Sequence, residues 1–155
     1  MNTAPLLHVQ DLRVDFTQGQ GKVFQALKGV SLSIHPGETV GLVGESGSGK
    51  TTLGRVILGL TEATQGQILF DGEDITHASR ARRRTLGRDI QVVFQDPYGS
   101  LNPARTVGDT LAEPLLSDKS LSTQDIAQRI AEVLQRVGML ADTAQRYPGQ
   151  FSGGQ

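Results

Sequence analysis

Gly44-Glu45-Ser46-Gly47-Ser48-Gly49-Lys50-Thr51 is the most informative segment of this sequence for its fold. It fits the pattern G-x-x-x-x-G-K-S/T at every required position. Its glycines allow backbone conformations that other residues avoid, so successive N–H groups can turn inward around a phosphate chain. A lysine at this position reaches the β and γ phosphates, and the following threonine hydroxyl is a ligand for Mg²⁺. The stretch predicts a phosphate-binding loop for a nucleoside triphosphate.

The residues on both sides of this loop support the prediction. Thr39–Val43 is a short, mostly apolar run, which is typical of a parallel strand buried on both faces. Thr52–Leu60 follows as a predicted helix, whose positive N-terminal end faces the loop. This order favours a phosphate site over a glycine-rich connection with a coincidental lysine. The loop occurs in many unrelated enzymes, so it indicates a nucleotide but no particular reaction.

Upstream of the loop, the sequence predicts two half-buried strands. Apolar and polar residues alternate in two runs, which are separated by the turn-forming stretch Gln18–Gly21. The apolar positions are Leu7, Val9, Leu12, Val14 and Phe16 in the first run, and Val30, Leu32 and Ile34 in the second. Such alternation is typical of antiparallel strands with one solvated face, so we predict an antiparallel β portion.

Composition and charge argue against several other classes of protein. The chain has 155 residues, a formal net charge of −1 and no cysteine, which excludes disulfides and thiolate metal sites. A basic run contains Arg80, Arg82, Arg83, Arg84 and Arg88. No aromatic residues interleave with it, so we interpret it as a solvated helix face and expect no nucleic acid as partner. His8, His35 and His77 lack metal-ligand spacing.

Two further segments carry candidate site residues. Ile90–Phe94 is a predicted strand that ends at Gln95, where a polar side chain would face the ligand crevice of an α/β fold. The pattern alone leaves a ligand role and a surface turn equally open. The segment Phe151–Gln155 contains a serine and two glycines that could open a helix and offer N–H groups to an anion. Without context it is a weak glycine turn.

Together these segments identify a family. From about Leu7 to Gln155 the sequence resembles the ATP-binding cassettes of ABC transporters, and Phe151–Gln155 is a close match to the family's signature motif. The phosphate loop, the glutamine and the signature occur in the family's order. The resemblance implies an ATPase that couples ATP binding and hydrolysis to transport, with ATP and Mg²⁺ as cofactors. The fold that it implies is α/β, a P-loop NTPase core with an antiparallel β portion.

A finer resemblance lies between Val92 and Leu115. Val-Val-Phe-Gln-Asp-Pro-Tyr-Gly-Ser-Leu-Asn-Pro is followed there by Ala-Arg-Thr-Val and then by Glu-Pro-Leu. This stretch, together with Tyr147-Pro148, resembles the importers of oligopeptides, dipeptides and nickel. Gly149-Gln150 departs from the charged residue that the family usually has after the proline. The resemblance leaves the transported solute open.

The resemblance also implies roles for matching positions. Phe16 stands where the family has an aromatic residue that stacks on adenine, with a core strand residue as the alternative. Gln95 matches the glutamine that contacts Mg²⁺ or the attacking water, which makes it the implied catalytic residue and, with Thr51, a metal ligand. The implied nucleotide-binding residues are Phe16, Gly44, Glu45, Ser46, Gly47, Ser48, Gly49, Lys50, Thr51 and Thr52, and, toward the nucleotide of an opposite cassette, Ser152, Gly153, Gly154 and Gln155.

We expect two domains with a boundary near Asp96. Residues 1–95 form the nucleotide-binding α/β core, and residues 96–155 form a partial helical subdomain that ends in the signature. Ser122–Asp125 predicts a helix start. The apolar residues that share one face of this helix are Ile126, Ile130, Val133, Leu134 and Val137. We interpret this stripe as core.

The family's remaining properties follow as expectations. The implied partners are a second ABC ATPase subunit, identical or different, and transmembrane permease subunits, at the cytoplasmic face of the inner or plasma membrane. The family's catalytic glutamate, magnesium-binding aspartate and histidine loop do not occur in these 155 residues. We therefore expect a cassette that is incomplete at its C-terminus, exposes apolar surface and does not hydrolyse ATP by itself. A soluble ABC-type ATPase acting on nucleic acid or ribosomes and a nonfunctional fragment are the alternatives.

Overall fold

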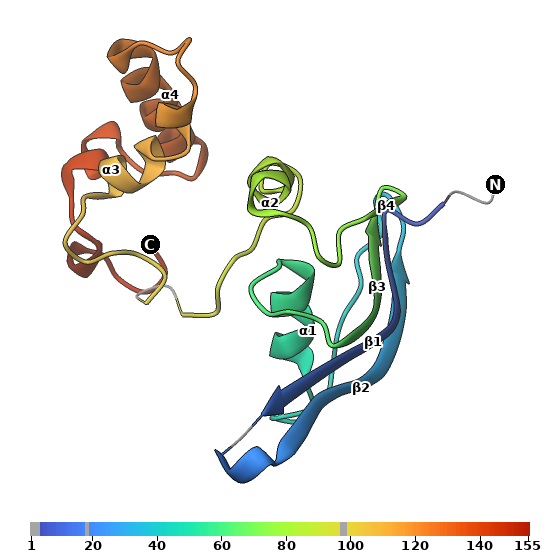
Figure 1. The fold of residues 1–155 in the computed structure, drawn as a ribbon. Coiled ribbons are helices and arrows are strands. Elements are labelled where there is room, and N and C mark those ends of the chain that lie inside the picture. The colour runs from blue at the N-terminus through green and yellow to red at the C-terminus, as the bar shows by residue number, and fades with distance from the viewer. Residues whose placement is uncertain (1–3, 18, 97–98) are drawn as a thin grey trace. The chain divides into compact units, whose positions relative to one another are not determined.

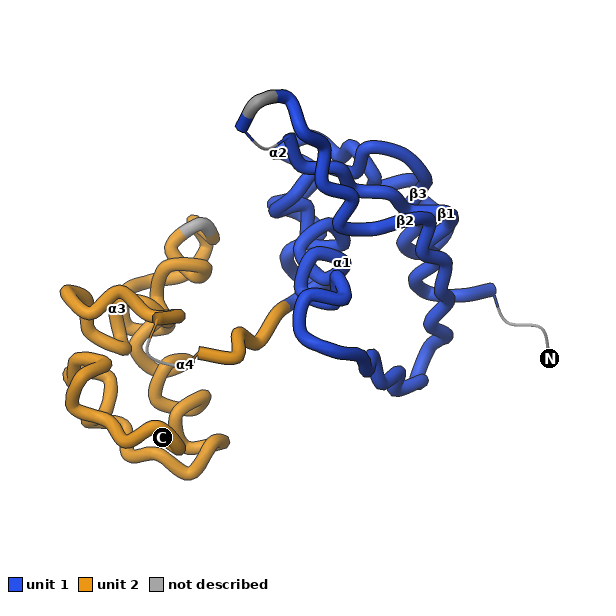
Figure 2. Tube along the Cα trace, turned by 90° about the horizontal axis from the view of Figure 1, so that it is seen from below, with its two compact units in different colours: residues 1–91 blue, residues 92–155 orange. Residues whose placement is uncertain are grey.

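A computed structural model describes residues 4–17, 19–96 and 99–155. Gln18, Pro97 and Tyr98, which the sequence analysis includes, lie outside these ranges. Residues 1–91 and 92–155 form two compact units (Figure 2). In the described part of the chain, no helix combines the length and the apolar character that crossing a membrane requires.

The first unit is built on a four-stranded antiparallel sheet with the order β2-β1-β3-β4 (Figure 1). Its strands are β1 (Leu7–Thr17), β2 (Val23–Ile34), β3 (Gln65–Phe70) and β4 (Glu73–Asp74). A short 3-10 turn, Gly19–Gly21, lies between β1 and β2. The predicted antiparallel portion is confirmed, because the two strands expected from the alternation pair with each other over most of their length.

Helix α1 (Lys50–Ile57) covers one face of this sheet (Figure 1). Leu53 and Val56 of α1 are buried against apolar residues of the strands, which places the hydrophobic core between helix and sheet. The buried core residues are Val9, Leu12, Val14, Leu27, Leu53, Val56, Ala63, Ile68, Ile75 and Leu86. The phosphate-loop helix is thus fixed by its own apolar side to the antiparallel strands.

The prediction of buried strands at Thr39–Val43 and Ile90–Phe94 is wrong for this structure. Neither segment is assigned to a strand. Val43 is 91 % exposed and Val93 is 97 % exposed. A parallel strand forms only where a neighbouring strand completes its hydrogen-bond ladder, and the sheet of the described residues contains only β1 to β4. Apolar sequence alone therefore does not make these segments strands.

All arginines of the basic run except Arg88 lie in α2 (Arg80–Leu86), and the contacts of Arg83 correct the prediction of a solvated face. The Arg83 guanidinium donates to the carbonyl of Ile57 at 2.9 Å and to that of Ile75 at 2.6 Å. Ile57 is the last residue of α1, whose terminal carbonyls lack partners within the helix. Arg83 therefore ties α1 to the segment after β4. Arg82 instead pairs with Glu73 and lowers the pKa of that carboxyl.

Replacing Arg83 with methionine is expected to lower the free energy of unfolding by about 1–3 kcal/mol, because two partly buried carbonyls lose a charged donor. Arg84 on the same helix is exposed, so Arg84→Met is the matched control. It is expected to change the free energy of unfolding by less than about 0.5 kcal/mol. Urea denaturation followed by circular dichroism measures both. Equal stability of the two variants would show that the Arg83 contacts contribute nothing.

The second unit is helical. It contains α3 (Val107–Ala112), α4 (Thr123–Arg136) and the 3-10 turns Leu115–Ser117, Ala141–Gln145 and Pro148–Gln150. Helix α4 packs against α3 and against Ala141–Gln145. Ile130 and Leu134 are buried there, whereas Val133 and Val137 are exposed, which corrects the wider stripe predicted from the sequence. Ile126 is half-buried, so the buried stripe is narrower than predicted but extends beyond Ile130 and Leu134.

The predicted start of α4 is confirmed. The backbone N–H of Asp125 donates to the Ser122 hydroxyl at 3.1 Å, and the Asp125 carboxylate accepts from the Ser122 backbone N–H at 2.8 Å. These bonds, first of all that from the Ser122 hydroxyl, hold the pKa of Asp125 below its ordinary value. The cap therefore stabilises the helix above the ordinary carboxyl pKa and is lost as the pH falls through the lowered value.

Candidate nucleotide-binding site

The phosphate loop leads directly into α1. Gly49, the residue before the helix, has a φ of +94°, which a residue with a side chain rarely adopts. Its carbonyl accepts the first helical hydrogen bond, from the Leu53 N–H at 2.9 Å. Gly49 has no side chain to cap this end of α1. The first N–H groups of the helix and its positive end therefore face the loop, an arrangement that attracts anions.

The Lys50 ammonium lies inside the curve of the loop. It donates to the carbonyls of Gly44 at 2.7 Å and Glu45 at 2.6 Å, and to the Ser48 hydroxyl at 3.2 Å. These contacts join the first residues of the loop to its end. They place a full positive charge beside the N–H groups that lead into α1. A phosphate chain in the same curve would meet both kinds of donor.

Thr51 and Thr52 occupy the first turn of α1. Thr51 is exposed, and in the described ranges its hydroxyl makes no hydrogen bond. A hydroxyl oxygen is a hard ligand of the kind that Mg²⁺ accepts alongside phosphate oxygens. Within the described residues there is no cluster of three histidine or acidic side chains that would hold a metal by itself. The Thr51 hydroxyl therefore fits Mg²⁺ as a single ligand beside phosphate oxygens.

Phe16 lies at the end of β1, on the same face of the sheet as the buried Val14. Its side chain is 42 % exposed, unlike that of Val14, which is 1 % exposed. Phe16 therefore lies past the edge of the core, which favours a stacking residue over the alternative of a core strand residue. Its partner across the strands is Phe24 of β2, which the sequence analysis did not single out. Finding Phe24 requires the register of the hairpin, and the sequence pattern does not give that register.

Gln95 belongs to the second unit, whereas the phosphate loop belongs to the first. It is exposed and lies outside any helix or strand. Its proposed contact with Mg²⁺ or with the attacking water stays a prediction.

The signature residues form a hydrogen-bonded turn. The Gln155 side-chain carbonyl accepts from the backbone N–H and from the hydroxyl of Ser152, each at 3.1 Å, and the Gln155 N–H donates to the Ser152 carbonyl at 3.0 Å. Beside this turn is a mainly apolar cavity of about 170 Å³, whose lining includes Leu101, Met139 and Phe151. The contact of Ser152–Gln155 with a nucleotide also stays a prediction.

The first unit contains Phe16 and residues 44–52, and the second unit contains Gln95 and Ser152–Gln155.

Comparison with known proteins identifies the family. A family model described as "ABC transporter" matches residues 27–155. The chain is 46 % identical to the glutathione import ATP-binding protein GsiA of Escherichia coli strain K12 and to that of Shigella boydii serotype 4. Each match covers 97 % of this chain and 25 % of the relative, so the chain spans about a quarter of the length of these relatives.

Solved structures agree with the match to the ABC transporter family. The dimeric, post-hydrolysis structure of the ATP-binding cassette MJ0796 bound to ADP and Pi matches with a TM-score of 0.80 at 28 % identity, over 96 % of this chain and 64 % of that one. The structure of cbiO1 from Clostridium perfringens, part of an ABC transporter complex, matches with a TM-score of 0.73 at 29 % identity, over 97 % and 57 %. The predicted fold class is confirmed, although these chains extend beyond the region matched. By its sequence and its fold, the chain belongs to the ABC transporter family.

Proposed function

We propose that this chain is part of the ATP-binding subunit of an importer, in which ATP binding and hydrolysis drive the uptake of peptides or related small solutes. One observation carries the nucleotide assignment: the Lys50 ammonium lies within the loop that leads into α1, 2.7 Å from the Gly44 carbonyl. The importer assignment rests on the 46 % identity to GsiA, a protein named for glutathione import. Glutathione is a small peptide-like solute, which fits the resemblance between Val92 and Leu115.

Each part of the site has a role in this proposal. Residues 44–52 bind the phosphates through backbone N–H groups and the Lys50 ammonium, while Phe16 stacks on the adenine. Thr51 and, from the family resemblance, Gln95 would hold Mg²⁺, which when bound would neutralise phosphate charge, and Gln95 would orient the attacking water. Ser152–Gln155 contact the γ-phosphate of a nucleotide held by an opposite cassette. In this proposal residues 1–95 are the nucleotide-binding core and residues 96–155 the helical subdomain, a boundary a few residues after that between the compact units 1–91 and 92–155.

The proposal includes partners. A second ABC ATPase subunit, identical or different, completes each nucleotide site, as the dimeric form of MJ0796 suggests by analogy. Transmembrane permease subunits bind the helical subdomain, which would keep the protein at the cytoplasmic face of the membrane as a peripheral subunit. Neither the net charge of −1 nor the arginines of α2, two of which are engaged in contacts within the protein, favours nucleic acid as a partner.

The role of Phe16 is tested by Phe16→Ala. We expect the affinity for ATP to fall about tenfold and the affinity for inorganic triphosphate to stay unchanged, because only the adenine loses its aromatic partner. Isothermal titration of each ligand in the presence of Mg²⁺ measures both affinities. Equal weakening of the two ligands would count against stacking and would point to a change in the phosphate loop.

A further inference from the structure

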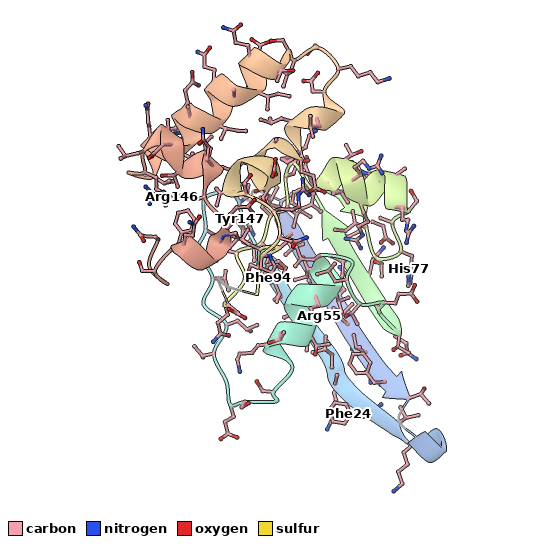
Figure 3. All side chains as sticks on the ribbon, turned by 90° about the vertical axis from the view of Figure 1, so that its left-hand side faces the viewer. Phe24, Arg55, His77, Phe94, Arg146 and Tyr147 are labelled. Atoms are coloured by element: carbon pink, nitrogen blue, oxygen red, sulfur yellow. The ribbon has the colours of Figure 1, made fainter. Side chains whose placement is uncertain are left out.

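A second aromatic side chain lies directly opposite Phe16. In the antiparallel pairing of β1 with β2, Phe16 faces Phe24, and residues paired in this way have Cβ atoms about 4.5–5.5 Å apart. Both side chains are partly exposed, Phe16 by 42 % and Phe24 by 49 %. Figure 3 labels Phe24 on β2, near the hairpin end of the sheet. The two residues form an exposed aromatic pair on one face of the hairpin.

A bulge in β2 determines which face of the sheet carries the aromatic pair. Val14 pairs with Leu27, but the next residue of β1, Asp15, pairs with Gln25, so Ala26 is the extra residue. In an unshifted register Phe16 would face Gln25, and Phe24 would move to the opposite face of the sheet. With the bulge, Phe24 and Phe16 share the face of the buried Val14, against which α1 packs.

The same bulge touches the phosphate loop. A Cβ atom on Gly49 would lie 2.8 Å from the carbonyl oxygen of Ala26 and 2.8 Å from a methyl group of Leu27. The last glycine of the loop therefore lies against β2 at the bulge. Phe24 is two residues farther along β2, a distance of about 7 Å along the strand. A nucleotide whose phosphates lie in the loop has its base within reach of the aromatic pair.

We propose that Phe24 is a second aromatic residue of the base subsite, and that it contacts the base that stacks on Phe16. The inference rests on the proposed nucleotide function and adds to it a specificity residue that the sequence motifs do not mark. A flat, weakly hydrated purine base gains contact area from two rings, whereas the phosphates gain nothing from them. Phe24 therefore favours ATP over a ligand that has the same phosphates and no base.

A fluorescence experiment tests the position of Phe24. The chain has no tryptophan, so Phe24→Trp introduces a single reporter. We expect Mg²⁺-ATP to quench its emission and Mg²⁺ with inorganic triphosphate to leave it unchanged. Val23→Trp is the matched control, because Val23 is the adjacent residue, is 61 % exposed and points to the opposite face. An equal response of both reporters to ATP, or no response of Phe24→Trp at saturating ATP, would overturn the inference.

Affinity measurements separate this inference from the proposed function. Phe24→Ala is expected to weaken ATP binding about 3- to 10-fold without changing the binding of inorganic triphosphate, and Val23→Ala is expected to change neither. Retained triphosphate binding shows that the variant is folded. If Phe24→Ala bound ATP as tightly as the unchanged chain, the inference would fall and the proposed function would stand. If the unchanged chain bound neither ligand, the proposed function would fall, and the inference with it.

Discussion

Replacing Lys50 with alanine is expected to lower the affinity for Mg²⁺-ATP by about 10²-fold or more. The ammonium is the one side-chain cation within residues 44–51, and it already lies in the curve of the loop, 2.6 Å from the Glu45 carbonyl. Its loss removes at least two charge-assisted hydrogen bonds to phosphate, each of which contributes about 1.5–3 kcal/mol. Isothermal titration of ATP into the variant measures the loss.

The matched control is Lys28→Ala. Lys28 is an exposed lysine of β2, so this variant changes the net charge by the same amount without touching the loop. It is expected to bind ATP within about twofold of the unchanged chain. Thermal unfolding of both variants shows whether the fold is retained. An affinity of Lys50→Ala close to that of Lys28→Ala would rule out the loop as the phosphate site.

Replacing Gly66 with alanine is expected to lower the free energy of unfolding of the first unit by about 3–5 kcal/mol. Gly66 lies in β3 with a φ of +92°, and a Cβ there would lie 2.6 Å from the Gln10 carbonyl oxygen and 2.5 Å from that of Asp11. Both atoms belong to the backbone of β1, at the irregularity where Asp11 has a φ of +42°. The strands would have to separate to admit the methyl group.

Gly72→Ala separates this clash from the strain of the backbone. Gly72 follows β3 and has a similar φ of +79°, but a Cβ there would meet no atom within 4 Å. We expect Gly72→Ala to lower the free energy of unfolding by only about 1–2 kcal/mol, which is the strain of the left-handed conformation. Denaturant unfolding compares the two variants. Similar losses at both positions would mean that β1 and β3 are not packed as closely as described.

The sequence predicted well the features that are set by nearby residues. The alternation of β1 and β2 and the Ser122–Asp125 cap depend on contacts within a few residues or across one hairpin. The helix predicted at Thr52–Leu60 is present as α1, but it begins at Lys50 and ends at Ile57. The sequence did not predict the features that depend on residues far away in the chain. Thr39–Val43 has the composition of a buried strand, yet a strand needs a neighbouring ladder, which the pattern of one segment does not report. The sequence predicts a solvated Arg83 because the Ile57 carbonyl, one of its partners, lies far from it in the sequence.

The candidate site shows the same division. The phosphate loop was predictable because its motif encodes both the glycine conformations and the cation in consecutive residues. The pairing of Phe24 with Phe16 was not predictable, because the bulge at Ala26 shifts the register and exchanges the faces on which Phe24 and Gln25 lie. The roles of Gln95 and Ser152 were inferred from family resemblance, since they depend on residues of another unit or another cassette. They stay predictions.

Phosphate binding by residues 44–52 is measured by titrating the ¹⁵N-labelled chain with Mg²⁺ and inorganic triphosphate. This ligand carries the phosphates without a base. We expect the largest amide shifts at Gly47, Ser48, Gly49, Lys50 and Thr51, because the N–H groups of the loop and of the first turn of α1 donate to the phosphates. Saturable shifts confined to other residues, such as the arginines of α2, or no saturable shift at all, would contradict the account.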